Sequence, residues 1–219
     1  YDGPRFVYFP TASPEAAKTG EAALGIGRLN PDPATPFGRA LAAMRARGPS
    51  AYPGSPAVAR ALTRPQDRLV LMELHPAEHR ALSRTLAGPG VAIHRRDGFE
   101  GALAMAPLTP RRGMVLIDPS YEVKTEYEAT AAFVRRLVAK WPQAAVLIWY
   151  PLLEAGRHRA LLEGLRPLTA LVDEVAFTDA PERGMAGSGL ALVNAPHGAG
   201  AIFAAAHAQA AGILRPMKG

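Results

Sequence analysis

The stretch MVLIDPSYE (residues 114–122) runs four apolar residues directly into an aspartate, a proline, a serine and a tyrosine. A short apolar run that ends in turn residues is typical of a strand covered on both faces. Similar runs occur at 5–9, 68–74, 91–96, 145–151, 171–177 and 190–194. Helical patterns lie between several of them, at 75–86, 124–141 and 156–165. This alternation predicts an open, mostly parallel α/β sheet, in which ligands bind beyond the carboxyl ends of the strands.

The composition is that of a globular protein. Of the 219 residues, 48% are hydrophobic and 20% are charged, which is the usual balance for a soluble domain. The absence of cysteine excludes disulfides and thiolate metal sites and is compatible with the cytoplasm. The longest apolar run, Ala144–Leu153, is interrupted by Pro151 and is shorter than the roughly 20 residues of a membrane span. We therefore expect a cytoplasmic protein without membrane association, and a monomer.

Residues 10–67 fit the β–α alternation less well than the rest. They are rich in proline and helical in pieces, and they separate the first two predicted strands by far more than one helix requires. We interpret about 15–67 as an inserted helical subdomain within a single domain that spans 1–219.

Acidic side chains stand at the ends of three successive predicted strands. Glu73 ends the second strand, Asp97-Gly98 follows the third, and Asp118 ends the fourth. An acid after the second strand can bind ribose hydroxyls, as in nucleotide-binding α/β folds. An acid after the third can accept a hydrogen bond from an adenine amino group. The alternative is that these residues only cap helices or form turns.

The opening stretch has a chemical interpretation of its own. The exocyclic amino nitrogen of adenine is a poor nucleophile because its lone pair is delocalised into the ring. If the Asp118 carboxylate and the Pro119 carbonyl each accept one N–H, the lone pair is localised and aimed at an electrophilic methyl group on a sulfonium. Proline has no N–H to compete and stiffens the turn. Tyr121 is expected to stack on the base, which contributes about 1–3 kcal/mol.

The residues Asp118-Pro119-Ser120-Tyr121 resemble the (D/N/S)-P-P-(Y/F/W) motif of amino-methyltransferases that use S-adenosylmethionine. Other motifs extend the resemblance, namely YPGSP (52–56), ELHP (73–76), RRDGF (95–99), RRGMVLIDPSYE (111–122), IWYP (148–151) and GMAGSGLALVNAP (184–196). Their order is that of the bacterial 23S ribosomal RNA adenine-N6 methyltransferase family, formerly described as competence or DNA-utilisation proteins. The resemblance covers about residues 15–196.

The resemblance implies a Rossmann-like S-adenosylmethionine-dependent methyltransferase fold and N6-methylation of an adenine in 23S ribosomal RNA. The cofactor would contact Ser55, Glu73, Asp97, Gly98 and Asp118. Asp118 would also be the catalytic acceptor of the amino group, together with Pro119, and Tyr121 would hold the target base. A second interpretation of Ser55 is a helix N-cap before Pro56.

The chain departs from the family pattern at two places. Ser120 replaces the second proline of the motif, which leaves the acceptor groups in place. After FVYF (6–9) the family's glycine-containing loop is missing, although such folds need a tight turn there. We expect that residues are absent from this sequence between Phe9 and Pro10.

The charge of the chain favours a polyanionic partner. The formal net charge is +6 and the pI about 10.0. Many arginines come in near-pairs, at 45 and 47, 95 and 96, 111 and 112, 135 and 136, and 157 and 159. They would hold the phosphates of naked or partly assembled ribosomal RNA while the base is extruded. The alternatives are a solvated surface without a partner, a DNA adenine methyltransferase, and a non-catalytic basic nucleic-acid-binding protein.

Three remaining features do not point clearly to a functional site. His75 and His79 lie four residues apart, but no third ligand is evident, so we predict no metal site. GMAGSGL (184–190) precedes a predicted strand and is either the family's loop beside the active site or a tight turn. Trp149 and Tyr150 are expected to pack in the core or the cofactor pocket rather than to bind nucleic acid.

Overall fold

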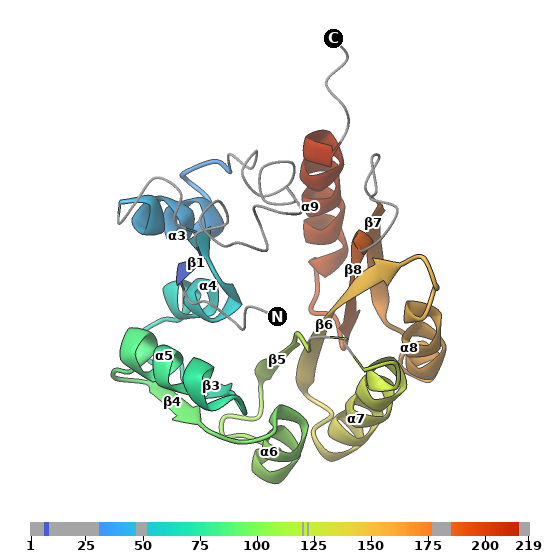
Figure 1. Ribbon diagram of the computed structural model, residues 1–219, viewed down its shortest axis with the longest axis horizontal. Coiled ribbons are helices and arrows are strands. Elements are labelled where there is room, and N and C mark those ends of the chain that lie inside the picture. Colours follow the sequence, from blue (N-terminus) through green and yellow to red (C-terminus); the bar gives the residue numbers. More distant parts are fainter. Residues whose placement is uncertain are drawn as a thin grey trace. The chain divides into compact units, whose positions relative to one another are not determined.

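The computed structural model describes residues 7–8, 31–46, 52–119, 121, 123–176 and 185–214. The chain divides into two compact units, residues 1–101 and 102–219. The structure has the predicted α/β character in both units (Figure 1). The single domain over 1–219 stays a prediction. In the described part of the chain, no helix combines the length and the apolar character that a membrane crossing requires.

The first unit contains two small sheets and short helices. Its elements are β1 (Val7–Tyr8), α3 (Pro36–Arg45), β2 (Tyr52–Pro53), α4 (Ser55–Leu62), β3 (Leu69–Met72), α5 (Pro76–Leu86) and β4 (Val91–His94). α6 (Gly98–Met105) begins in this unit and ends in the second. β3 and β4 pair in parallel, as expected, from Leu69 opposite Val91 to Met72 opposite His94. β1 instead pairs antiparallel with β2, a short strand that was not among the predicted ones.

α3 and α4 lie within the range of the predicted helical insertion, about 15–67, which stays a prediction. α3 begins where Thr35 caps it, because the Thr35 side chain accepts a hydrogen bond from the Gly38 N–H at 3.0 Å. Pro36 at the first helical position needs no hydrogen-bond partner for its nitrogen. Leu41 and Met44 then bury one face of the helix.

The second unit is a four-stranded sheet covered by helices. Its elements are β5 (Gly113–Ile117), α7 (Glu126–Lys140), β6 (Ala144–Leu153), α8 (His158–Leu165), a 3₁₀ turn (Arg166–Leu168), β7 (Leu171–Ala176), β8 (Met185–Val193) and α9 (Ala199–Leu214). The strand order is β5-β6-β8-β7. β5 and β6 are parallel, whereas β8 runs antiparallel to both of its neighbours.

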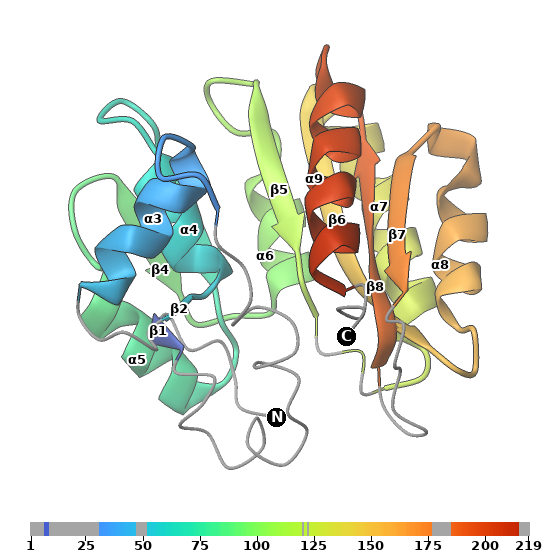
Figure 2. The same ribbon diagram turned by 90° about the horizontal axis from the view of Figure 1, so that it is seen from above.

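Helices lie on both faces of this sheet (Figure 2). α7 and α8 pack together on one face, and α9 lies on the other against β7, where His207 contacts Asp173 at 2.7 Å. The core under α7 and α8 is fully buried and consists of Tyr127, Val134, Leu137, Val146, Ile148, Tyr150, Leu161 and Leu165. The buried face of α7 therefore contributes to this core.

Residues 185–190 of the glycine-rich stretch are not a turn before a strand, because they belong to β8 (Met185–Val193) itself. A Cβ at Gly189 would lie 2.3 Å from Cε2 and Cζ of the buried Tyr150 ring, and one at Gly187 would lie 2.3 Å from the Val175 carbonyl oxygen. The glycines thus allow close approach of neighbouring groups inside the sheet.

β6 is longer than the strand beside it. Its last pairing with β5 is Ile148 opposite Ile117, but it continues through residues 149–153 with β8 as its partner. On the β5 side, this overhang presents backbone carbonyls beyond the point where β5 ends. The segment that follows β5 packs against these carbonyls, and this packing positions the candidate site.

Candidate active site

Asp118 and Pro119 directly follow β5 at the carboxyl end of the parallel β5–β6 pair. The Asp118 side chain keeps access to solvent, but the protein around it removes part of the water shell of its carboxylate. This desolvation raises the pKa of Asp118 above its ordinary value. A carboxylate with a raised pKa holds a proton or a donated hydrogen bond more strongly than an ordinary aspartate does.

Tyr121 is buried next to this turn, with 5% of its surface exposed. Its backbone φ is 54°, a left-handed conformation that is rare for a residue with a bulky side chain. Its hydroxyl donates a hydrogen bond to the Trp149 carbonyl oxygen on the β6 overhang, at 2.9 Å. Burial raises the pKa of Tyr121, so the hydroxyl stays protonated and remains a donor.

Tyr127, in the first turn of α7, makes a similar contact. Its hydroxyl donates to the Pro151 carbonyl oxygen at 3.3 Å, and its ring centroid lies 4.4 Å from that of Tyr121. We call Tyr121 and Tyr127 on these two carbonyls the tyrosine clasp. A strained backbone conformation, such as that of Tyr121, persists only where surrounding contacts stabilise it. The tyrosine clasp provides such contacts and so stabilises the turn that carries Asp118.

The position of Tyr121 bears on its predicted role. Its ring faces Tyr127 and lies 6.3 Å from the Trp149 ring, so in this structure it supports the turn from inside the protein. Stacking of Tyr121 on a target base would require the ring to leave this position. That stacking role stays a prediction.

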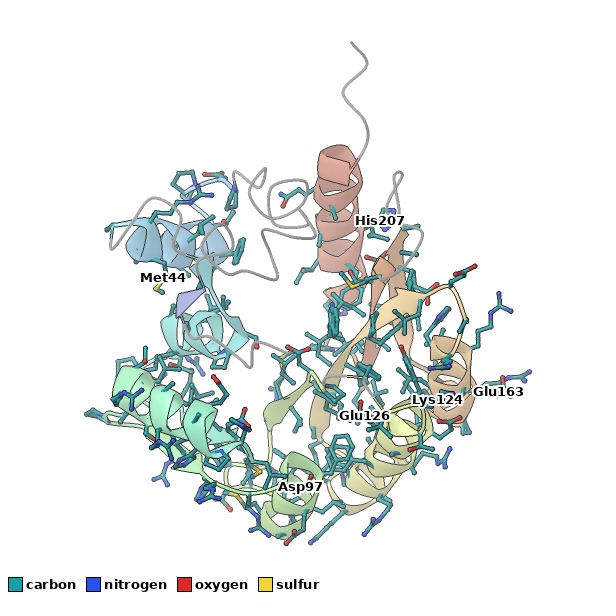
Figure 3. The ribbon with its side chains drawn as sticks, viewed as in Figure 1. Met44, Asp97, Lys124, Glu126, Glu163 and His207 are labelled. Atoms are coloured by element: carbon teal, nitrogen blue, oxygen red, sulfur yellow. The ribbon has the colours of Figure 1, made fainter. Side chains whose placement is uncertain are left out.

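Sequence reasoning did not identify Tyr127 and Glu126 as site residues. Both lie at the start of α7, three or more residues beyond the motif, and Glu126 is labelled beside Lys124 in Figure 3. Within the described residues, Oε2 of Glu126 is buried and has no hydrogen-bond partner. Nothing in the motif signals this acceptor, because its burial depends on packing around the clasp.

Glu73, Asp97 and Gly98 lie at the edge where the parallel strands β3 and β4 end. The Glu73 backbone N–H donates to the His94 carbonyl, and Glu73 Oε1 accepts from the His75 N–H at 2.7 Å. Asp97 Oδ1 accepts from the Glu100 N–H at 2.8 Å, so Asp97 caps α6 (Figure 3). A carboxylate has further acceptor positions, and capping therefore leaves Asp97 able to bind a ligand.

Two observations concern the fit of a cofactor in the first unit. A Cβ at Gly98 would meet no atom within 4 Å, so the space beside its backbone is open. Ser55 is the first residue of α4, and Gly54 caps the helix without a side-chain hydrogen bond. The interpretation of Ser55 as an N-cap is therefore wrong, and its exposed hydroxyl is not engaged in capping. Phe9 and Pro10, between which we expect missing residues, lie outside the described residues.

The structure thus forms two groups of candidate residues, each within its own unit. Glu73, Asp97 and Gly98 share one strand edge, and the Asp118-Pro119 turn and Tyr121 share another. That these two groups meet around one cofactor stays a prediction. In the described part of the chain, no three histidine, aspartate or glutamate residues are grouped as metal ligands.

Known proteins match this architecture over most of its length. A family model described as "Ribosomal RNA large subunit methyltransferase D, RlmJ" matches residues 8–206. The Ribosomal RNA large subunit methyltransferase J of Escherichia coli is 33% identical over 151 residues, which are 66% of this chain and 54% of the relative. The protein of the same name from Haemophilus influenzae is 32% identical over 197 residues, 84% of this chain and 70% of the relative. The chain therefore spans about half to two thirds of these relatives.

A solved structure also matches. The crystal structure of protein LPL1258 from Legionella pneumophila superimposes with a TM-score of 0.77 at 26% sequence identity. The match covers 95% of this chain and 81% of that chain. The fold is thus shared with a solved protein.

Proposed function

Because the chain belongs to the RlmJ family of ribosomal RNA large subunit methyltransferases, we propose that it transfers a methyl group from S-adenosylmethionine to N6 of an adenine in 23S ribosomal RNA. The observation that carries this proposal is the turn after β5. There a carboxylate with a raised pKa and a proline carbonyl stand side by side at the carboxyl end of a strand, held by the tyrosine clasp.

In this mechanism Asp118 and Pro119 orient the amine. The Asp118 carboxylate accepts one N–H of the adenine amino group and the Pro119 carbonyl accepts the other, so the nitrogen lone pair points outward. S-adenosylmethionine, when bound, supplies a methyl group on a positively charged sulfur. Methyl transfer would form the nitrogen–carbon bond as the carbon–sulfur bond breaks, and the methylated amine would then lose a proton. The raised pKa of Asp118 favours the carboxylate as the first acceptor of that proton.

The cofactor residues are proposed in the first unit. Glu73 at the end of β3 would bind the ribose hydroxyls, and Asp97 would accept a hydrogen bond from the adenine amino group of the cofactor. The open space beside Gly98 suits a close approach of the cofactor to the backbone. The Ser55 hydroxyl at the start of α4 would complete the contacts, and Asp118 would lie near the methyl donor.

The substrate would be naked or partly assembled ribosomal RNA, because unpaired bases are the ones that such an enzyme can extrude. The reaction would take place in the cytoplasm with the protein as a monomer.

The test is incubation of the purified protein with labelled S-adenosylmethionine and total RNA from cells that lack the enzyme, followed by nucleoside analysis. N6-methyladenosine in 23S RNA with the wild type, lost in Asp118→Ala, is the expected result. Asp67→Ala is the matched control, since this carboxylate is paired with Arg64 instead, and it should remain active. Label in added DNA but not in RNA would favour the DNA alternative. An absence of transfer to either would favour a non-catalytic protein.

A further inference from the structure

A group of exposed cations lies at the end of the second-unit sheet opposite Asp118. It consists of Arg111, Arg112, Arg136 and Lys140, all exposed, and we call it the amino-edge cluster. Arg111 and Arg112 precede β5, whereas Asp118 follows it, so the strand separates the cluster from the site. Figure 2 shows the connection from α6 at one end of β5 and the segment to α7 at the other. At about 3.3 Å per residue, the five residues of β5 place these ends about 17 Å apart.

The fold brings the two halves of this cluster together. The indole N–H of Trp141 donates to the Arg111 carbonyl oxygen, and Trp141 is only 2% exposed. Its ring packs over Gly113, where an added Cβ would lie 2.8 Å from the ring. Lys140 precedes Trp141, and its ammonium donates to the Leu103 carbonyl at 2.7 Å. The loop before β5 and the last turns of α7 are therefore one anchored surface.

The charge of the cluster is not neutralised within the described residues, where none of its four members forms an ion pair. The sequence from 103 to 117 contains no acid. Glu163, late in α8, is paired with Arg166 at 3.3 Å. Other arginines are engaged with the protein, since Arg96 pairs with Glu100 and Arg135 donates to the Gly164 carbonyl.

The edge that carries Asp118 has a different balance of charge. Its exposed or half-buried charged side chains are of both signs, namely Asp118, Glu126, Glu128, Glu154, Lys124, Arg157 and Arg159. This edge therefore has no excess of positive charge to attract a phosphate backbone. Part of the contrast follows from the dipole of α7, which favours acids in its first turn and Lys140 in its last. The dipole does not explain Arg111 and Arg112, which lie outside any helix.

We propose that the amino-edge cluster binds phosphates of the RNA substrate, away from the methylated base. This proposal rests on the proposed function, since it concerns the same RNA. Phosphate contacts set the register of a nucleic acid without reading its sequence. The length of β5 separates the cluster from Asp118 by about 17 Å. A structured ribosomal RNA is long enough to place one base near Asp118 while phosphates elsewhere on its backbone contact the cluster.

The test compares pairs of substitutions that remove equal charge. Arg111→Gln/Arg112→Gln and Arg136→Gln/Lys140→Gln remove the charges of the cluster members, and Gln at each position keeps a polar side chain. Arg39→Gln/Arg64→Gln is the control, because these arginines bond the Ala34 carbonyl and Asp67. Binding to labelled, protein-free transcripts of large-subunit ribosomal RNA is followed by fluorescence anisotropy at several salt concentrations. Thermal unfolding and S-adenosylmethionine affinity show whether each variant is folded. The pair Arg111→Lys/Arg112→Lys keeps the positive charge and is the second control.

Each cluster pair should reduce the magnitude of the slope of log affinity against log salt by roughly 1.4, because every phosphate that is no longer neutralised removes about 0.7 from it. The control pair and the lysine pair should keep the wild-type slope. If folded cluster variants keep the wild-type slope and affinity, or if the control pair weakens binding as much, the inference is overturned. These measurements do not need methyl transfer. If the wild type shows no salt-dependent RNA binding at all, the proposed function fails as well, whereas unchanged cluster variants overturn only the inference.

Discussion

Replacing Tyr121 with phenylalanine separates two roles for this residue. The substitution keeps an aromatic face, so base stacking predicts almost unchanged methyl transfer. If the hydroxyl instead holds the Asp118 turn through the tyrosine clasp, Tyr121→Phe leaves the partly buried Trp149 carbonyl without its 2.9 Å donor. Loss of a hydrogen bond of this kind costs about 1–2 kcal/mol, in the lower part of the usual range because the bond is only partly buried. If this loss is felt in the transition state, kcat/KM falls roughly tenfold for each 1.4 kcal/mol.

The assay combines denaturant unfolding with steady-state methyl transfer to RNA. Tyr150→Phe is the matched control, because it removes a hydroxyl bond of the same length, 2.9 Å to Glu174 Oε1, outside the turn. It should reduce stability without changing kcat. Tyr121→Ala removes the ring as well and should cost about 3–5 kcal/mol of stability. An unchanged free energy of unfolding together with unchanged kcat/KM in Tyr121→Phe would refute the anchoring role and leave stacking as the better explanation.

Three further outcomes are expected. Partial desolvation raises the pKa of Asp118 in the folded protein above that in the unfolded chain. The stability that Asp118 contributes is therefore fully present below about pH 4 and is lost as pH rises through the folded pKa. Asp118→Asn should therefore be at least as stable as the wild type at pH 7 by denaturant unfolding, yet inactive, and wild-type activity should fall as pH drops through the raised pKa. Glu73→Ala should weaken S-adenosylmethionine binding in calorimetry more than it weakens RNA binding; equal affinity for the cofactor would reject Glu73 as a cofactor residue. Gly189→Ala places a Cβ against the Tyr150 ring and should lower the free energy of unfolding by about 1–3 kcal/mol, with part of the loss recovered when Tyr150→Leu is added.

Most strands and the helices α5, α7 and α8 could be predicted from local sequence, whereas β2, α6 and α9 were not predicted. Apolar runs that end in an acid or are followed by one predicted β3, β4 and β5 within a few residues, because these strands are defined by their own composition. The placement of Glu73 and Asp97 at one edge follows from parallel pairing alone. The helix α7 was equally predictable from the sequence, because its buried residues recur at helical spacing.

The parts that were not predicted depend on contacts between distant residues. The glycines of β8 looked like a turn because the Tyr150 ring that requires Gly189 lies 39 positions earlier, a separation that no local pattern reveals. Tyr121 looked like an exposed stacking residue because its hydroxyl partner belongs to a different strand. Pro151 looked like the end of β6, but the strand continues because β8 still pairs with it.

The overhang of β6 has a consequence for folding in the cell. A strand without a neighbour on one side is a template on which a second copy can add, and such edges cause edge-to-edge aggregation unless they are covered. Residues 149–153 lie beyond the last pairing with β5. The two hydroxyls of the clasp donate hydrogen bonds to the carbonyls of Trp149 and Pro151, which a second strand would otherwise use. Pro151 also removes one N–H from that edge. The same two tyrosines that hold the Asp118 turn therefore also block the pairing of a second molecule with this overhang of β6.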